Sequence, residues 1–527
     1  MPSSLEKTDG NKTAVDVTHE YVELELEGTR LADVAPDYGR PWWRVPHLLR
    51  LNLLLTVPLL TPYIMGYDGS MFNGMQSMEA WQDQFGHPTG AKLGVLATMQ
   101  TIGNIVSAPI ATYATDRYGR RWPIIGGCVL CIVGGVLQSI AGSVCMLIIS
   151  RAIVGVGSGF TCTAAPPLIA ELSYPTQRAI VTAILTTFWY LGSLVAAWSA
   201  YASYHIDSGW CWRILPLIQI VPCVIQLALM FLVPESPRWL IANGQDAQAE
   251  KDLALLHGGS IQPTELVQFE LREIRQAIQN EASQQTSSYM HFMTTPGNRY
   301  RLFIATTLGL LVQWCGNGVG TYYLTPVLAG IGMKSVGTQN LISSVLQTSN
   351  YAVAMFSSML MNRVGRRPLL LVSLIGMTLG LITWTVLSAV NESQGGSNNG
   401  VGIGIVIVIF LYFVFYNVAL NPVPMTYLLE VLPFTLRAKG VTIYSQVQNL
   451  SSVFLGFVNP IALDAIAWKY YIVFIVITVG FLFLIWRFYP ETKGRSLEEV
   501  GQIFDGIAAK DVSDLERRSS GGTDTTK

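Results

Sequence analysis

The amino-acid sequence predicts an all-α membrane protein with twelve transmembrane helices in two six-helix halves, joined by a cytosolic helical linker. Of its 527 residues, 50% are hydrophobic and only 13% are charged, whereas a soluble protein has about 25% charged residues. Twelve apolar runs approach the roughly 20 residues that a helix needs to cross a bilayer. Short polar signatures between these runs occur twice in the same order, which indicates a tandem repeat of one membrane unit.

The twelve runs are expected to be helices, because only helices and closed barrels satisfy the backbone in lipid and the runs are too long for strands. The first six lie near 48–66, 91–114, 122–143, 147–171, 180–202 and 214–233. The last six lie near 301–330, 339–361, 368–390, 401–428, 440–463 and 470–489.

The chain is accordingly divided into five parts. These are a disordered cytosolic tail, the N-terminal half, a cytosolic helical linker, the C-terminal half and a second cytosolic tail, at 1–46, 47–234, 235–300, 301–490 and 491–527. Two amphipathic stretches of the linker, near 246–256 and 264–282, predict a small helical bundle. An ordered linker without a bundle is the alternative.

Three signatures form the repeat. Asp116-Arg117-Tyr118-Gly119-Arg120-Arg121 returns 246 positions later as Asn362-Arg363-Val364-Gly365-Arg366-Arg367. Glu171 with Arg178 returns 259 positions later as Glu430 with Arg437. Pro234-Glu235-Ser236-Pro237-Arg238 returns 256 positions later as Pro490-Glu491-Thr492-Lys493-Gly494-Arg495. The basic loops alternate with loops that carry few positive charges, so the positive-inside rule places both termini in the cytosol.

Several other functions are disfavoured by what the sequence lacks. No phosphate-binding GxxxxGK[ST] loop, HExxH motif or catalytic triad is evident, so we expect neither an enzyme nor an ATP-driven pump. No metal cluster or basic block occurs, and we expect no metal, no cofactor and no nucleic-acid partner. Gly155, Gly157 and Gly159 lie inside an apolar run with no strand before them, which favours close helix packing over dinucleotide binding. Asn391-Glu392-Ser393 is a glycosylation sequon that we expect to stay unmodified, since it lies close to the membrane.

Four motifs make the chain resemble the sugar porter branch of the major facilitator superfamily over about 45–505. They are Gly66-Tyr67-Asp68, Arg151 to Gly159, Pro234 to Arg238 and Pro490 to Gly494. Within that branch, Gln313-Trp314-Cys315-Gly316-Asn317-Gly318 and Thr186 to Tyr190 resemble the fungal lactose and cellodextrin permease-like and hexose transporter group. The resemblance implies alternating access for a small-molecule sugar, in a functional monomer of the plasma membrane.

The repeated arginines predict two cytosolic gates, because acidic partners occur at matching places in both halves. The gate residues are Asp116, Arg117, Arg120, Arg121, Glu171, Arg178, Glu235 and Arg238 in one half, and Arg363, Arg366, Arg367, Glu430, Arg437 and Glu491 in the other. A simple topology signal is the alternative for the basic residues. Asn362 stands where the family has Asp, so the second gate is expected to be looser.

The resemblance also implies a sugar site rich in neutral amides and aromatic rings. Its candidate residues are Thr186, Gln313, Asn317, Tyr322, Tyr323, Asn350, Met425 and Gln448. Thr186 and Met425 replace bulkier groups of hexose carriers, which favours a disaccharide, with a hexose or pentose as the alternative. Each amide taken singly could instead serve interhelical hydrogen bonding.

Asp68 and Arg151 are the candidate proton-coupling residues. A carboxylate inside a membrane domain is costly unless it is paired, and it marks an ion pathway or a structural pair. By resemblance, the matching acid takes the proton in proton-coupled sugar porters, whereas facilitative relatives typically have Asn. The sequence therefore favours proton–sugar symport into the cell, with the proton as coupling ion. A facilitative uniporter and a nontransporting sugar sensor remain the alternatives, and a polyol or quinate carrier is possible.

Overall fold

The computed structural model describes residues 36, 39–283, 289–330, 332–333, 335–394, 399–493, 500 and 503–504. All regular structure within these ranges is helical. The chain divides into two compact units. One comprises Met1–Leu53 and Pro237–Ser283, and the other comprises Leu54–Ser236 and Gln284–Lys527. Most of both predicted tails lies outside the described residues.

The first six membrane helices are long and nearly unbroken. They are α3 (Pro46–Gln76), α5 (Gly90–Tyr118), α6 (Arg121–Ser139), α7 (Val144–Leu172), α8 (Arg178–Ser203) and α9 (Trp210–Met230). A short helix, α4 (Glu79–Phe85), follows α3. Ser143 caps α7, because its hydroxyl accepts a hydrogen bond from the backbone amide of Met146 at 3.3 Å.

The last six membrane helices include two that are broken. The first is divided into α14 (Pro296–Trp314), α15 (Asn317–Tyr322) and α16 (Leu324–Gly330), after the short α13 (His291–Thr294). The others are α17 (Val336–Val364), α18 (Arg366–Ser393), the broken pair α19 (Asn399–Ala419) and α20 (Val423–Val431), α21 (Phe434–Ile466) and α22 (Tyr470–Phe488). Gly316 provides the first break, since its φ of 97° is a left-handed conformation that favours glycine.

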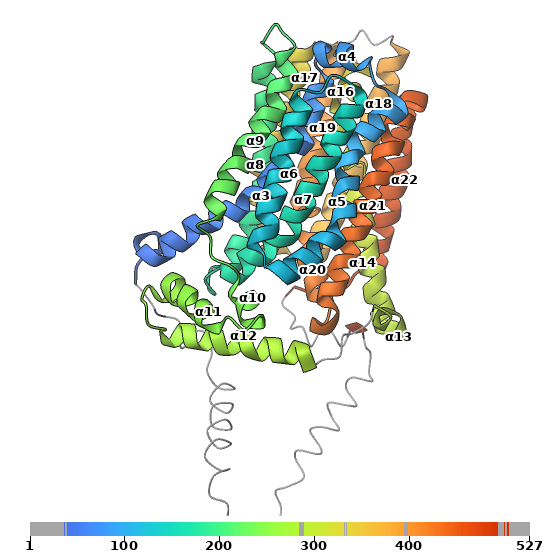
Figure 1. Ribbon diagram of the computed structural model, residues 1–527. Helices are drawn as coiled ribbons and strands as arrows, with labels where there is room; N and C mark the ends of the chain where they lie inside the picture. Colours follow the sequence, from blue (N-terminus) through green and yellow to red (C-terminus); the bar gives the residue numbers. More distant parts are fainter. Residues whose placement is uncertain are drawn as a thin grey trace, which may run out of the picture. The chain divides into compact units, whose positions relative to one another are not determined.

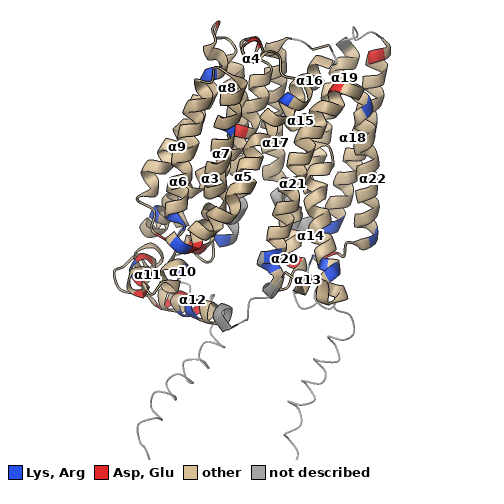
Figure 2. Ribbon diagram, turned by 45° about the vertical axis from the view of Figure 1, so that its right-hand side comes forward, with Lys and Arg blue, Asp and Glu red and all other residues tan. Residues whose placement is uncertain are grey.

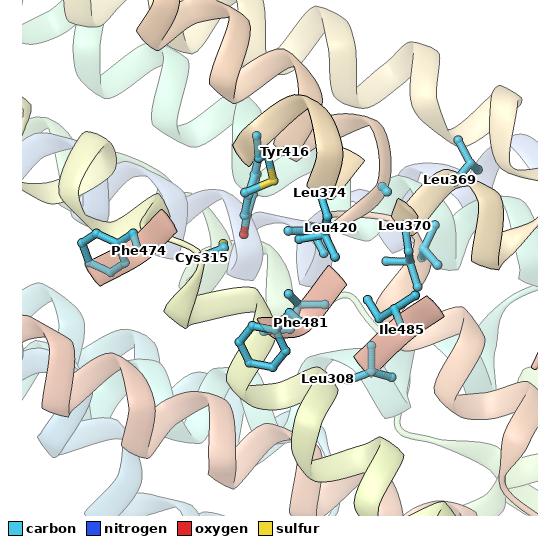
Figure 3. Close-up of a cluster of buried hydrophobic side chains, with 14 of the residues drawn as sticks. Leu308, Cys315, Leu369, Leu370, Leu374, Tyr416, Leu420, Phe474, Phe481 and Ile485 are labelled. Carbon is cyan, nitrogen blue, oxygen red and sulfur yellow. The ribbon is translucent and has the colours of Figure 1, made fainter. Parts of the chain in front are cut away.

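The prediction of twelve membrane helices in an all-α fold is confirmed. Length and hydropathy single out nine segments among the described residues, one of which, Lys439–Phe488, contains both α21 and α22. The remaining two helices, α8 and α17, have 26 and 29 residues. The long helices of the larger unit run side by side (Figure 1). Their packed interior includes the cluster around Leu308, Leu374 and Phe481 from α14, α18 and α22 (Figure 3).

The basic signatures lie where helices meet at one end of this unit. We call this the basic end and define it by Arg117, Arg120, Arg121, Arg366 and Arg367. Figure 2 shows basic and acidic residues together there in both halves. The other end, where α5 begins and α18 finishes, is called the opposite end.

The linker part of the smaller unit contains four helices among its described residues. They are α10 (Pro237–Ala242), α11 (Asp246–Leu253), η2 (Ala254–Gly258) and α12 (Glu265–Ser283), and they cover the two amphipathic stretches of the linker. Leu240, Leu253 and Leu271 belong to its apolar core. A buried hydrogen-bonded contact lies in the same unit, with His257 Nδ1 2.7 Å from Glu270 Oε2.

Candidate functional site

A polar cavity of about 380 Å³ lies among the middles of the membrane helices, within the volume range of typical ligand pockets. Four of the amides predicted for the sugar site line it: Gln313, Asn317, Asn350 and Gln448. They come from α14, α15, α17 and α21. Residues far apart in the sequence therefore present neutral donors and acceptors to one space.

The amides of this cavity are linked to one another by hydrogen bonds. Asn417 of α19 donates to Asn350 Oδ1 at 2.9 Å, and Asn350 donates to Gln347 Oε1 at 3.2 Å. Tyr190 of α8 donates its hydroxyl proton to Asn417 Oδ1 at 2.5 Å. The network thus joins α8 of the N-terminal half to α17 and α19 of the C-terminal half. Such links hold the amides in fixed orientations around the cavity.

A second, smaller network surrounds the break between α14 and α15. Asn317 donates to the hydroxyl of Tyr416 at 3.2 Å and accepts from the hydroxyl of Thr321 at 2.9 Å. Both partners also line the cavity. Asn317 and Thr321 of α15, the segment that follows the break at Gly316, are thus joined to Tyr416 of α19 in one hydrogen-bonded group.

Several residues of the cavity wall were not predicted from the sequence. They are Trp189, Tyr190, Gln347, Asn417 and Asn421. A signal for the last two existed: Asn417 and Asn421 are polar and interrupt a strongly apolar run. Trp189 and Tyr190 belong to the Thr186 to Tyr190 motif of α8 that carries part of the family resemblance, but only Thr186 was selected from it.

Two predicted residues, Met425 and Tyr323, are not among the described residues that line this cavity. Met425 of α20 is 40% exposed. Tyr323 is buried, and its hydroxyl donates to the carbonyl of Gly456 at 2.7 Å. Tyr323 lines two other cavities rather than this one. The side chains of Thr186 and Tyr322 lie outside the described part of the chain.

The predicted proton-coupling residues lie together in the interior. Arg151 Nη2 of α7 is 3.5 Å from Asp68 Oδ2 of α3, with side chains only 2% and 1% exposed. Gln219 of α9 donates to Asp68 Oδ1 at 3.1 Å. The ring of Phe72 lies 4.3 Å from Arg151 Cζ, which allows a cation–π contact. A carboxylate and a guanidinium thus neutralise each other away from water.

The ion pair adjoins a cavity of about 170 Å³, which Arg151 and Phe72 help to line. Gln100 of α5 also lines it, and its Oε1 accepts a hydrogen bond of 3.5 Å from Arg151. Gln313 and Trp189 line both this cavity and the larger one. The ion pair and the amide-rich space are therefore separated by a wall of only a few side chains.

At the basic end, ion pairs form within each half. Arg120 Nε is 3.2 Å from Glu171 Oε2 in the N-terminal half. Arg366 Nη2 is 2.7 Å from Glu430 Oε1 in the C-terminal half. Ser236 and Thr492 donate to the same two glutamates. The repeat in the sequence is thus a repeat of contacts.

The acids of the third repeated signature, Glu235 and Glu491, bond to backbone amides rather than to the predicted arginine side chains. Glu235 accepts hydrogen bonds from the backbone amides of Arg120 and Arg121, at 2.9 and 3.1 Å. Glu491 accepts from the backbone amides of Arg366 and Arg367, at 3.1 and 3.0 Å. These amides open α6 and α18, where the helix dipole favours a negative charge.

Glycine is required where these carboxylates approach the chain. Gly119 and Gly365 have φ values of 88° and 107°. A Cβ atom on Gly119 would lie 2.3 Å from Glu235 Oε2, and one on Gly365 would lie 3.2 Å from Glu491 Oε2. The glycine of the basic signature therefore permits both the turn and the contact with the acid.

The remaining gate candidates of the larger unit follow the same signatures, and one candidate, Arg238, belongs to the smaller unit. Asp116 and Arg117 are exposed at the end of α5, and Arg178 is exposed at the start of α8. Arg121 and Arg367 each donate to a backbone carbonyl, that of Phe231 at 2.7 Å and that of Trp486 respectively. Arg437 is half-buried in α21, and Arg238 is half-buried in α10 of the smaller unit. The side chain of Arg363 lies outside the described part of the chain.

The family model described as "Sugar (and other) transporter" matches residues 54–504. The chain belongs to this family. It is 28% identical over 461 residues to the MFS-type transporter criB of Aspergillus cristatus, covering 86% of this chain and 94% of that protein. It is 25% identical over 495 residues to the high-affinity glucose transporter of Kluyveromyces lactis, covering 89% and 88%.

Solved structures show the same fold. The inward-open conformation of the xylose transporter XylE from E. coli has a TM-score of 0.71 and 23% identity, covering 86% of this chain and 99% of that one. The chain is a sugar transporter of the major facilitator superfamily, with two repeated six-helix halves in one membrane protein. Its relatives and structural neighbours are transporters rather than enzymes.

Proposed function

We propose that this transporter is a proton–sugar symporter that moves its substrate into the cell by alternating access. The observation that carries the proposal is the buried Asp68–Arg151 pair, which adjoins a small cavity that shares the wall residues Gln313 and Trp189 with the amide-rich cavity. Burying a carboxylate inside a membrane domain costs free energy, and a role in proton transfer accounts for its presence there. The structural neighbour XylE is described as a proton:xylose symporter, which agrees with the proposal.

The amide-rich cavity is proposed as the sugar site. Neutral amides donate and accept hydrogen bonds with hydroxyl groups, and a sugar is a neutral molecule covered in hydroxyls. Aromatic side chains such as Trp189 and Tyr444 supply apolar faces for its CH groups. Tyr322 and Tyr323 remain candidates for closing the site, since they lie at the break between α15 and α16.

For the substrate we favour a hexose or pentose, with a disaccharide as the second candidate. The argument for a disaccharide depended on a wall shortened at Thr186 and Met425. Met425 is not among the described residues that line the cavity, whereas the bulky Trp189 and Tyr190 are. The Kluyveromyces lactis relative is named as a glucose transporter, which agrees with a monosaccharide.

The contacts at the basic end suggest how the access change takes place. The pairs Arg120–Glu171 and Arg366–Glu430 each lie inside one half. They hold the ends of the helices of one half together, so that each half can move as a rigid body. Gating then depends on whether these two clusters approach or separate at the cytosolic surface.

The proposal places both termini in the cytosol and the protein in the plasma membrane. The basic loops support this orientation, because positive charge favours the cytosolic side. The monomer is taken as the functional unit, since the amide-rich cavity and the Asp68–Arg151 pair both form within one chain. A facilitative uniporter is the main alternative, and a nontransporting sensor is a further one.

The experiment that tests the proposal is uptake of radiolabelled sugars in a cell that lacks its own sugar carriers. A panel of hexoses, pentoses, disaccharides and polyols identifies the substrate. Symport predicts uptake that rises at acidic external pH, concentrates the sugar and collapses with a protonophore. Uptake that merely equilibrates and ignores the protonophore would establish a uniporter instead. Sugar binding without any uptake would favour the sensor.

A further inference from the structure

A larger cavity, of about 830 Å³, lies at the opposite end of the membrane unit. Its walls come from the start of α5, the end of α18, the end of α21 and the start of α22. Because α5 and α18 run from one end of the unit to the other, this position is distant from the basic end. The mechanism proposed above does not use this space.

Two buried polar side chains of α18 line this cavity, and each has a described oxygen atom without a hydrogen-bond partner. Ser388 and Asn391 lie one helical turn apart, and their side chains are 6% and 3% exposed. In the described part of the chain, Ser388 Oγ and Asn391 Oδ1 have no partner, although both residues line the cavity. Buried polar atoms are normally paired, and leaving them unpaired is destabilising. A polar ligand would satisfy both.

The rest of the wall indicates which ligand chemistry fits. Trp468 and Tyr471 provide aromatic surface, and Glu392 and Asp464 provide carboxylates. The indole of Trp468 donates a hydrogen bond to Glu392, which orients that ring and the acid together. Aromatic faces pack against CH groups, while carboxylates, Asn and Ser bond to hydroxyls. This combination suits a neutral saccharide better than an anion, which the two acids would repel.

The charged groups also argue against a lipid chain as the occupant. His87, Glu392 and Asp464 all line the cavity, and ionisable groups are avoided where a wall faces hydrocarbon. Their presence at the ends of helices is consistent with contact to water. The cavity is larger than the amide-rich one, and it lies within the range of ligand pockets.

We propose that this cavity is a second saccharide-binding site, which holds the sugar before it enters the transport path. Tyr323 lines both this cavity and the smaller one beside Arg151, so the two spaces share a wall residue. The inference rests on the proposed function for the identity of the sugar, but its residues are different from those of the amide-rich cavity. The buried position of Asn391 agrees with the expectation that its sequon stays unmodified.

Photolabelling of the full-length protein in lipid nanodiscs tests the proposal. The probes are diazirine derivatives of glucose and of cellobiose, with labelled peptides mapped by mass spectrometry. We expect label on α18 and on the start of α22, competed by the unmodified sugar. Asn391→Leu should reduce that label about tenfold, since it removes a buried hydrogen-bonding group from the ligand. Gln313→Ala should leave it unchanged while reducing label around α14.

Val390→Ala is the matched control, because Val390 precedes Asn391 on α18 and is 37% exposed. It should leave the label on α18 unchanged. Without sugar, Asn391→Leu should keep or raise the midpoint of thermal unfolding, because the replaced amide oxygen is unpaired. A marked fall in that midpoint would assign Asn391 a structural role and overturn the proposal.

Two further outcomes separate this proposal from the proposed function. Normal sugar uptake with label confined to α14, α15 and α17 would overturn the second site alone. Suppose instead that α18 is photolabelled, that unmodified sugar reduces this label, and that the protein takes up no sugar. This result would support the second site and count against the transport proposal. Co-purified lipid that is lost in Asn391→Leu, with no sugar label on α18, would replace the saccharide by a lipid and overturn the inference.

Discussion

Asp68→Asn is the substitution that most directly tests proton coupling. It removes one charge but keeps the shape of the side chain and the Oδ1 acceptor of the Gln219 hydrogen bond. At the 3.5 Å separation of Asp68 and Arg151, the Coulomb attraction is about 5 kcal/mol for an effective dielectric constant of about 20. Removing one partner of a buried pair typically costs about 3–5 kcal/mol. The cation–π contact between Arg151 and Phe72 is present in both proteins, so Arg151 keeps one partner in the variant, which should fold with reduced stability.

The transport effect should be larger and qualitatively different. One proton moving through a membrane potential of about 100 mV supplies about 2.3 kcal/mol, which corresponds to roughly 40-fold accumulation of sugar. Without a titrating group at position 68, no proton accompanies the sugar. Asp68→Asn should therefore bring the accumulation ratio to about one, while exchange of labelled for unlabelled sugar continues.

The assay is sugar accumulation in proteoliposomes with an imposed potential and pH gradient, followed by counterflow without a gradient. Asp83→Asn is the matched control, since it makes the same chemical change on a side chain that is 74% exposed. The control should accumulate sugar like the wild type. Accumulation by Asp68→Asn to the wild-type ratio would refute the assignment of Asp68. Loss of both accumulation and counterflow would require a check that the variant is folded.

Three further predictions address the sugar site, the basic end and the smaller unit. Gln313→Ala should weaken sugar binding roughly tenfold, because it removes hydrogen bonds from a buried ligand; equal affinity by calorimetry would exclude Gln313 from the site. Gly119→Ala should lower the thermal midpoint more than Gly365→Ala, because its Cβ would lie 2.3 Å rather than 3.2 Å from a carboxylate oxygen; equal shifts would contradict that geometry. Burial raises the pKa of the Asp252 carboxyl, so its contribution to folding becomes less favourable as pH rises from its unfolded pKa through its folded pKa. Asp252→Asn should therefore slow hydrogen exchange of α11 relative to the wild type at neutral pH, and this difference should shrink in acid.

The membrane helices could be predicted because their signal is independent of tertiary contacts. Each apolar run must satisfy its own backbone in lipid, so length and composition suffice. The buried acid at position 68 was also visible, since a carboxylate between apolar runs is rare. The repeated pairs Arg120–Glu171 and Arg366–Glu430 followed from charge complementarity between signatures that occur in both halves.

The composition of the cavity wall was harder to predict, because it depends on helix rotation and on breaks. Met425 illustrates this. Met425 follows the interruption between α19, which ends at Ala419, and α20, which begins at Val423. Helical periodicity does not continue across such an interruption, so the direction of a side chain after it could not be predicted from the residues before it. Tyr190 was missed because only Thr186 of the Thr186 to Tyr190 motif was chosen as a site residue. Its hydroxyl bond to Asn417 depends on the approach of two helices that the sequence does not specify.

Coupling between proton and sugar requires that one site respond to the other, and the wall between the two cavities suggests how. Protonation of Asp68 would weaken its ion pair with Arg151, whose guanidinium already bonds to Gln100 on the smaller cavity. Hydrogen bonds would then rearrange on a surface that includes Gln313, which also lines the amide-rich cavity. Thermodynamic linkage makes this effect reciprocal: if protonation favours sugar binding, bound sugar must favour the protonated acid by the same factor. Gln313→Ala should therefore weaken not only sugar affinity but also the sensitivity of that affinity to pH.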